Sequence, residues 1–143
     1  MARIKIEQPE HFIFTTTIEV RVTDLNYGNH LGNDALLGIV HEARVRFYSS
    51  LGFPDERNVF GTGLIMADTA IQYRSEGFLA DVLTISVGVH DINRMGYDLV
   101  YRIVNQHGAE VAIAKTGMVC FDYSIRKVCP LPEAFVAAVN LKR

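Results

Sequence analysis

Two short stretches of this chain carry side chains suited to proton transfer. The candidate catalytic residues are Asp24, Asn26, His30, His41 and Glu42. A histidine exchanges its proton near neutral pH and a carboxylate accepts one, so either group can act as a general base. Asn26 does not ionise, so it can orient a water or a carbonyl group but cannot take a proton.

The backbone between the two stretches offers a second kind of chemistry. Glycines and asparagines over residues 24–33 indicate a tight connection, and Asn33 or Asp34 can cap the helix that we expect to follow. The first N–H groups of a helix lack partners within it, and the helix dipole favours an anion there. Leu31, Gly32 and Asn33 are therefore predicted to bind a substrate group on which negative charge develops.

The elements on either side of this connection follow from hydrophobic periodicity. Apolar and polar residues alternate over residues 12–23, which predicts a half-buried strand. From Asn33 to Leu51 the apolar residues recur at spacings of three and four, which predicts a helix of about 19 residues with one apolar face. Gly52 and Pro54 supply its end. Gly38 is a weak helix former, so we expect close packing at that position, against a second backbone or a ligand.

The rest of the chain has a β pattern. Strands are expected over residues 64–73, 82–92, 97–103 and 110–123, and a short terminal helix over residues 133–141. Tyr97 and Tyr101 alternate along one strand and are expected in the core. The fold class is α+β in a single domain, residues 1–143: one long helix wrapped by a five-stranded antiparallel sheet. One helix cannot cover both faces of such a sheet, so a partner subunit is expected.

Composition narrows the classes of function. The 143 residues are 49% hydrophobic and 21% charged, which is typical of a folded globular protein. A net charge of −2 argues against nucleic-acid binding. We find no apolar run long enough to cross a membrane and no apolar leader in residues 1–12. Cys120 and Cys129 are expected as reduced thiols in the cytoplasm, without a metal site.

Several motifs in this order resemble the 4-hydroxybenzoyl-CoA thioesterase (YbgC-like) family of hot-dog proteins. The resemblance rests on residues 24–33, on Glu42-Ala43-Arg44, on Tyr73-Arg74 and on Ala80-Asp81-Val82. It spans residues 12 to 125. It implies a hot-dog fold and an acyl-CoA thioesterase that needs no cofactor.

The resemblance also implies an assembly and a place for the substrate. Two subunits join their sheets edge to edge, and such dimers assemble into tetramers in part of the family. The active site lies at the subunit interface near the N-terminus of the long helix. CoA occupies a surface groove, and the acyl chain lies in a tunnel beside the helix.

Three positions depart from the family pattern. Asn26 stands at its second Asp, His41 at the first Glu of its Glu-Glu pair, and Gly32 at its first Asn. The base is therefore open among four residues, each with a structural alternative. Asp24 caps the turn if it is not catalytic, and Glu42 is otherwise an exposed side chain on the flank of the helix. His41 is otherwise an interface residue and His30 a donor that orders the loop.

Arginines are candidates for the phosphates of CoA, because a guanidinium matches phosphate geometry. Arg74 and Arg94 are the candidates for substrate binding, with Arg126 as a further one; the alternative for each is ordinary surface charge. Loss of two carboxylates also leaves open a second function, a protein that binds acyl-CoA or an acyl carrier without hydrolysing it. A third, less favoured function is a hot-dog dehydratase that uses an Asp/His pair.

Overall fold

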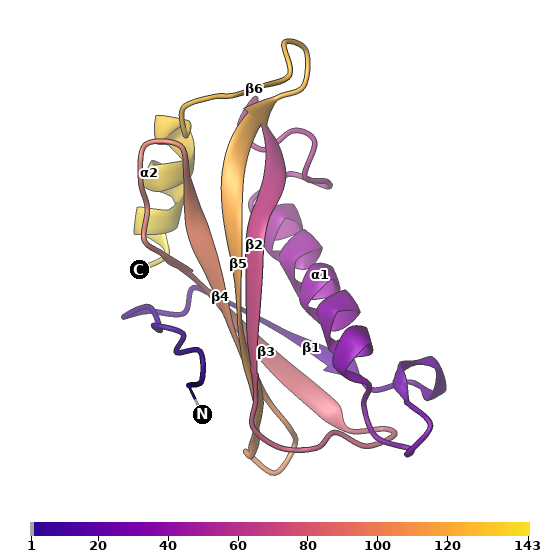
Figure 1. Ribbon diagram of the computed structural model, residues 1–143. Helices are drawn as coiled ribbons and strands as arrows, with labels where there is room; N and C mark the ends of the chain where they lie inside the picture. The colour runs from indigo at the N-terminus through magenta and orange to yellow at the C-terminus, as the bar shows by residue number, and fades with distance from the viewer. Residues whose placement is uncertain (1) are drawn as a thin grey trace.

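A computed structural model describes residues 2–143 as one long helix lying along one antiparallel sheet (Figure 1). The elements are β1 (Phe14–Glu19), the 3-10 turn η1 (Val22–Asp24), α1 (Asn33–Ser50), β2 (Gly63–Tyr73), β3 (Val82–His90), β4 (Gly96–Val104), β5 (Glu110–Asp122), β6 (Lys127–Val128) and α2 (Glu133–Leu141). The strand order is β1-β3-β4-β5-β2, and β6 pairs with β5. The predicted α+β class is confirmed. The sheet has six strands rather than five, because the two-residue β6 is too short to leave a periodic pattern.

The first strand is shorter than its sequence pattern predicts. β1 ends at Glu19, and the chain then turns through η1. The carboxylate of Asp24 stabilises this turn, because it accepts a hydrogen bond from the backbone N–H of Arg21 at 2.9 Å. Val22, which the alternation would bury, is 70% exposed. A side-chain contact thus overrides the strand pattern here.

The predicted apolar face of α1 is confirmed. The residues that it buries are Leu36, Ile39, Val40, Ala43, Arg44, Phe47 and Tyr48. Gly52 adopts a φ of +96°, which glycine tolerates, and the chain leaves the helix there. Within the described chain, a Cβ at Gly38 would meet nothing within 4 Å, so the close packing expected there stays a prediction about a second backbone or a ligand.

The core lies between α1 and the facing side of the sheet, and it contains hydroxyl pairs. Tyr97 and Tyr101 are buried, as predicted. Their hydroxyls pair with those of Tyr48 and Thr116, each at 2.8 Å, so neither phenol is left unsatisfied. α2 adds Phe135, which stacks on Tyr97 with ring centroids 4.3 Å apart. α2 thereby closes the core beside the first residues of β4.

The N-terminal segment covers part of the other side of the sheet. In Figure 1 it lies across the strands from α1. Ile13 donates its N–H to the carbonyl of Val87 at 2.9 Å, and Pro9 packs on Gly88. Val100 and Ile113 are fully buried yet lie outside the main core cluster. The chain itself therefore buries apolar area that we had expected a partner subunit to cover.

One long edge of the sheet stays open. β2 pairs only with β5, so the other edge of this 11-residue strand has no partner among the described residues. Leu37, Met66 and Tyr73 are about half exposed on α1 and β2. Neither helix of the described chain is long and apolar enough to span a membrane.

Candidate functional site

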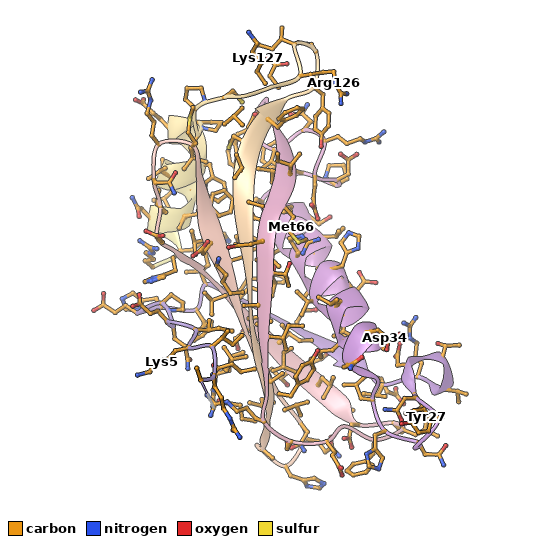
Figure 2. The ribbon with its side chains drawn as sticks, viewed as in Figure 1. Lys5, Tyr27, Asp34, Met66, Arg126 and Lys127 are labelled. Carbon is orange, nitrogen blue, oxygen red and sulfur yellow. The ribbon has the colours of Figure 1, made fainter. Side chains whose placement is uncertain are left out.

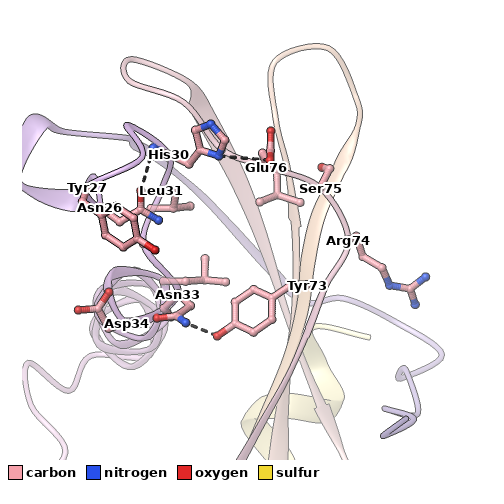
Figure 3. Close-up of a pocket in the computed structure, with 14 residues that line it drawn as sticks. Asn26, Tyr27, His30, Leu31, Asn33, Asp34, Tyr73, Arg74, Ser75 and Glu76 are labelled. Carbon is pink, nitrogen blue, oxygen red and sulfur yellow. Dashed lines mark hydrogen bonds and ion pairs between the residues drawn. The ribbon is translucent and has the colours of Figure 1, made fainter. Parts of the chain in front are cut away.

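A cavity of about 750 Å³ lies where the loop before α1 meets the end of β2 (Figure 3). Its walls are the loop after η1, the first turn of α1, the last residue of β2 and residues 74–77. The lining residues are Asn26, Tyr27, His30, Leu31, Gly32, Asn33, Asp34, Leu36, Tyr73, Arg74, Ser75, Glu76, Gly77 and Val111. The structure thus brings together six residues that the sequence predicts for the site: Asn26, His30, Leu31, Gly32, Asn33 and Arg74.

Asn26 shapes the loop. Its side-chain oxygen accepts hydrogen bonds from the N–H groups of Gly28 and His30, at 2.9 and 3.2 Å. Its own N–H donates to the carbonyl of His30 at 2.8 Å, and Asn29 completes the turn with a φ of +62°. The oxygen of Asn26 is therefore occupied within the loop, while its amide NH₂ remains free to donate.

Asp24 lies outside the cavity wall and is held by Arg21. Its carboxylate accepts the backbone N–H of Arg21 at 2.9 Å and two guanidinium hydrogen bonds, each at 3.1 Å. Burial acts to raise the pKa of Asp24, but the hydrogen bonds and charge of Arg21 outweigh it and lower that pKa. A carboxylate with a lowered pKa is a weak base, which favours the capping alternative for Asp24.

Of the backbone N–H groups predicted to bind substrate, those of Leu31 and Gly32 are already occupied by hydrogen bonds. The N–H of Leu31 donates to the carbonyl of Gly77, and that of Gly32 to the carbonyl of Asp24, both at 2.8 Å. Gly32 is the N-cap and supplies no side-chain cap, so the expected capping by Asn33 or Asp34 is wrong. Since intrahelical bonding begins with Leu36, the N–H groups of Asn33 and Asp34 are left without partners within the described chain. Both residues line the cavity.

Two side chains on the cavity wall, Tyr73 and Glu76, have roles that the sequence does not reveal. Glu76 pairs with His30, with 3.2 Å between carboxylate oxygen and Nδ1, and the His30 ring meets Phe78 edge-on. The hydroxyl of Tyr73 donates to the carbonyl of Asn33 at 3.2 Å (Figure 3). These contacts tie the loop and α1 to the end of β2. They join residues about 40 positions apart, so local patterns carry no signal for them.

The two candidates on the middle of α1 lie away from the cavity and on different sides of the helix. Glu42 pairs with Arg46 at 3.4 Å, and Arg46 in turn donates to Thr16 on β1. His41 lies toward β2, where its Nε2 is 3.7 Å from the carboxylate of Glu56. Neither residue lines the cavity of its own chain.

Among the arginines, Arg74 alone lines the cavity. It is half exposed and lies 3.6 Å from Glu110. Arg94 precedes β4, at the opposite end of the sheet, where its carbonyl accepts the N–H of Leu131. Figure 2 shows Arg126 at that same end, far from Tyr27 and Asp34. Within one chain, Arg94 therefore does not line this cavity.

Both cysteines are free thiols. Burial raises the pKa of the Cys120 thiol to about 11, which makes it unreactive at neutral pH. Within residues 2–143, no three or more His, Cys, Asp or Glu side chains are grouped so that they could hold a metal ion.

Comparisons with known proteins agree on one family. Residues 20–139 match the family model described as the Thioesterase-like superfamily. A 1,4-dihydroxy-2-naphthoyl-CoA hydrolase from Thermosynechococcus vestitus is 28% identical over 104 residues, which cover 71% of each chain.

Solved structures share the fold at low sequence identity. A Staphylococcus aureus protein in complex with CoA superposes with a TM-score of 0.81 at 22% identity, covering 99% of this chain and 90% of that one. A putative thioesterase from Pseudomonas aeruginosa gives 0.80 at 17% identity, covering 90% and 99%. A 1,4-dihydroxy-2-naphthoyl-CoA thioesterase from Synechocystis gives 0.79 at 21% identity, covering 89% and 95%. The predicted hot-dog fold is thereby confirmed.

Proposed function

Because the chain belongs to the Thioesterase-like superfamily, we propose that it hydrolyses the thioester bond of an acyl-CoA. The observation that carries the proposal is the cavity at the start of α1, where the N–H groups of Asn33 and Asp34 have no partner in the described chain. A relative named as a CoA hydrolase supports the same reaction class. Membership of the narrower YbgC-like family remains part of the proposal.

The backbone amides stabilise the negative charge that forms during the reaction. When water attacks the thioester carbonyl, negative charge develops on the carbonyl oxygen. The N–H groups of Asn33 and Asp34, at the positive end of α1, donate to that oxygen. Water adds to the carbonyl carbon, the C–S bond breaks, and the acid and free CoA thiol leave.

The remaining groups of the cavity position the substrate. Asn26, through its amide NH₂, and His30, paired with Glu76, line the part of the cavity formed by the loop. Arg74 is half exposed at the wall, which supports a role in binding a CoA phosphate. The apolar side chains of Leu31, Leu36 and Val111 face the acyl group.

We also propose that a second copy of the chain covers the open edge of β2. An unpaired strand of 11 residues presents a row of free backbone groups, which pair readily with an equivalent strand. Leu37 and Met66 beside that edge would be buried by such pairing. The assembly is therefore a dimer, or a tetramer built from dimers, and the free thiols are consistent with the cytoplasm.

The decisive measurement is thiol release by the purified protein from a panel of short, long and aromatic acyl-CoAs. The panel includes 1,4-dihydroxy-2-naphthoyl-CoA, since a relative is named for that substrate. Turnover of any member is the expected result, and the profile of rates defines the acyl class. Absence of release, with binding shown by a rise in Tm, would favour the non-hydrolytic alternative.

The role of the helix amides can be tested by removing one backbone donor. Asn33→Pro deletes an N–H at the first helical position, where proline fits the backbone, and Asn33→Ala deletes only the side chain. We expect Asn33→Pro to lower kcat about 100- to 1000-fold relative to Asn33→Ala, in line with loss of one oxyanion donor. Equal kcat values for the two variants would contradict this role.

A further inference from the structure

Cys120 and Cys129 lie opposite each other on two paired segments. β5 and β6 pair in antiparallel register, with Phe121 opposite Val128. One residue further from the turn, the same register places Cys129 opposite Cys120, and the backbone N–H of Cys129 donates to the carbonyl of Cys120 at 3.0 Å. Both side chains pack on the main core, so both lie on the same face of the sheet.

The separation of two residues in this arrangement suits a disulfide. In antiparallel strands, opposed residues that share a backbone hydrogen bond have Cα atoms about 5.5 Å apart. Disulfides span Cα separations of about 4.4–6.8 Å, most often near 5.5–6 Å. Both thiols are free in this structure. The backbone therefore already holds the two cysteines at a separation that a disulfide can bridge.

The two sulfurs differ in their surroundings. Cys120 is fully buried, and burial raises the pKa of its thiol. Cys129 is partly exposed and lines a second cavity, of about 390 Å³, together with Arg57 and Thr62. A small oxidant from solution therefore reaches Cys129 first, and Cys120 is the thiol placed to react with the product.

The Cys129 thiol also holds the loop that leads to β2. Its sulfur is 3.0 Å from Oγ1 of Thr62. Thr62 closes a tight turn with Val59, with which it exchanges backbone hydrogen bonds of 2.7 and 3.3 Å. Bonding of this sulfur to Cys120 removes its proton and rotates the Cys129 side chain. Oxidation therefore weakens the contact between Cys129 and Thr62.

We propose that Cys120 and Cys129 are a redox-sensitive pair, in which hydrogen peroxide closes a disulfide and thereby loosens the loop of residues 55–62. The pair lies outside the cavity at the start of α1. The proposal is therefore independent of thioester hydrolysis and stands whether or not the protein cleaves acyl-CoA.

Atoms and electrons balance in two steps. The thiolate of Cys129 attacks one oxygen of the peroxide, the O–O bond breaks, and Cys129 becomes a sulfenic acid. The hydroxide that leaves takes up the proton released by the thiol and becomes water. The sulfur of Cys120 then attacks that of Cys129, the S–O bond breaks, and the Cys120 proton leaves with the hydroxide as a second water. The two thiols lose two electrons, and the peroxide is reduced.

The first test is peroxide treatment of the dilute purified protein, followed by peptide mapping without a reducing agent. Trypsin separates the cysteines into peptides 116–126 and 128–142. We expect these peptides to be joined in chains that remain monomers on a denaturing gel, and dithiothreitol should release them. Absence of the joined peptides would overturn the proposal, whether the thiols stay free, are over-oxidised or bridge two chains.

The order of the two steps is tested with dimedone, which traps sulfenic acids. Cys120→Ala should leave Cys129 as a sulfenic acid after peroxide treatment, so a dimedone adduct is expected on Cys129. Cys129→Ala should give no adduct. An adduct on Cys120 in that variant would contradict the role of Cys129 as the thiol oxidised first.

Limited trypsin cleavage of the folded protein after Arg57 measures the loop, because this side chain is 86% exposed. Peroxide is expected to speed the cut about two- to tenfold, the range for loss of one hydrogen bond. Thr62→Val removes the partner of the thiol and should be cut faster before any oxidation.

Cys129→Ser is the matched control for this measurement. It keeps a hydroxyl for Thr62 but cannot form the disulfide, so peroxide should leave its rate of cleavage unchanged; this also controls for oxidation of methionine. Equal rates for oxidised and reduced wild type, or a peroxide effect of the same size in Cys129→Ser, would refute the loosening of the loop.

Discussion

The side chains of the loop before α1 are largely committed to building the loop. The side-chain oxygen of Asn26 accepts hydrogen bonds from two backbone N–H groups, and the carboxylate of Asp24 accepts hydrogen bonds from Arg21. The family pattern has an Asp at both positions. In this chain Asn26 is neutral and Asp24 is ion-paired. At the residue scale, the proposed reaction therefore relies on the backbone amides of Asn33 and Asp34.

Asp24→Asn should therefore reduce stability more than turnover. The native pKa of Asp24 is lowered by Arg21, so its contribution is present above the ordinary carboxyl pKa and is lost as the pH falls through the native value. We expect a loss of about 1–2 kcal/mol in the free energy of unfolding at pH 7, and a smaller difference from wild type at pH 3. Urea denaturation at both pH values measures this.

A contrary result is easily recognised. If Asp24→Asn unfolds like wild type at pH 7 but loses kcat, then Asp24 takes part in the reaction and its ion pair is incidental.

At the scale of elements, the N-terminal segment acts as a cover for the sheet. It has no regular secondary structure before β1, yet its backbone and Pro9 lie on β3. Gly88 permits this close approach, since a Cβ there would collide with Pro9 and lie 2.9 Å from the carbonyl of His11. Val100, which pairs with Gly88 in the sheet, and Ile113 are both fully buried.

Gly88→Val is expected to lift this segment and expose the apolar face beneath it. Overpacking of this kind costs about 1–3 kcal/mol, so Tm should fall and a protease should cut the N-terminal segment faster. Ser86→Val, two residues earlier on the same face of β3, is the matched control. Equal protease sensitivity in the two variants would show that the segment does not depend on Gly88.

At the scale of the whole molecule, the open edge of β2 is where the proposed assembly would affect the proposed function. The cavity lies at one end of that edge, and the pair of His41 and Glu56 lies beside the strand. Any partner that pairs with β2 therefore also changes what surrounds the cavity.

Met66→Lys should separate assembly from folding. Met66 is already 45% exposed, so a lysine there leaves the fold of the chain intact but places a charge in the proposed interface. We expect light scattering to show monomers and thiol release to fall at least about tenfold, with unchanged circular dichroism. Leu141→Lys, at an 88% exposed apolar residue on α2, should change neither. A dimeric Met66→Lys would contradict pairing along β2.

The sequence by itself determined the elements and the family resemblance. The apolar stripe of α1, the alternation in β3 and β4 and the end at Gly52 all depend on neighbours within a few residues, so periodicity predicts them. It also located the loop of residues 24–33, most of which lines the cavity. It failed at Val22, where the hydrogen bond from the backbone N–H of Arg21 to the carboxylate of Asp24 turns the chain out of the strand.

Only the tertiary structure decided how these pieces meet. The placement of β2 at the edge of the sheet follows from its pairing with β5, about 50 residues later in the chain. The pairs of His30 with Glu76 and of His41 with Glu56 join separate elements. The N–H of Leu31 donates to the distant carbonyl of Gly77, and the N–H of Gly32 donates to the carbonyl of Asp24 in η1. Such contacts depend on packing in three dimensions, and no spacing along the chain encodes them.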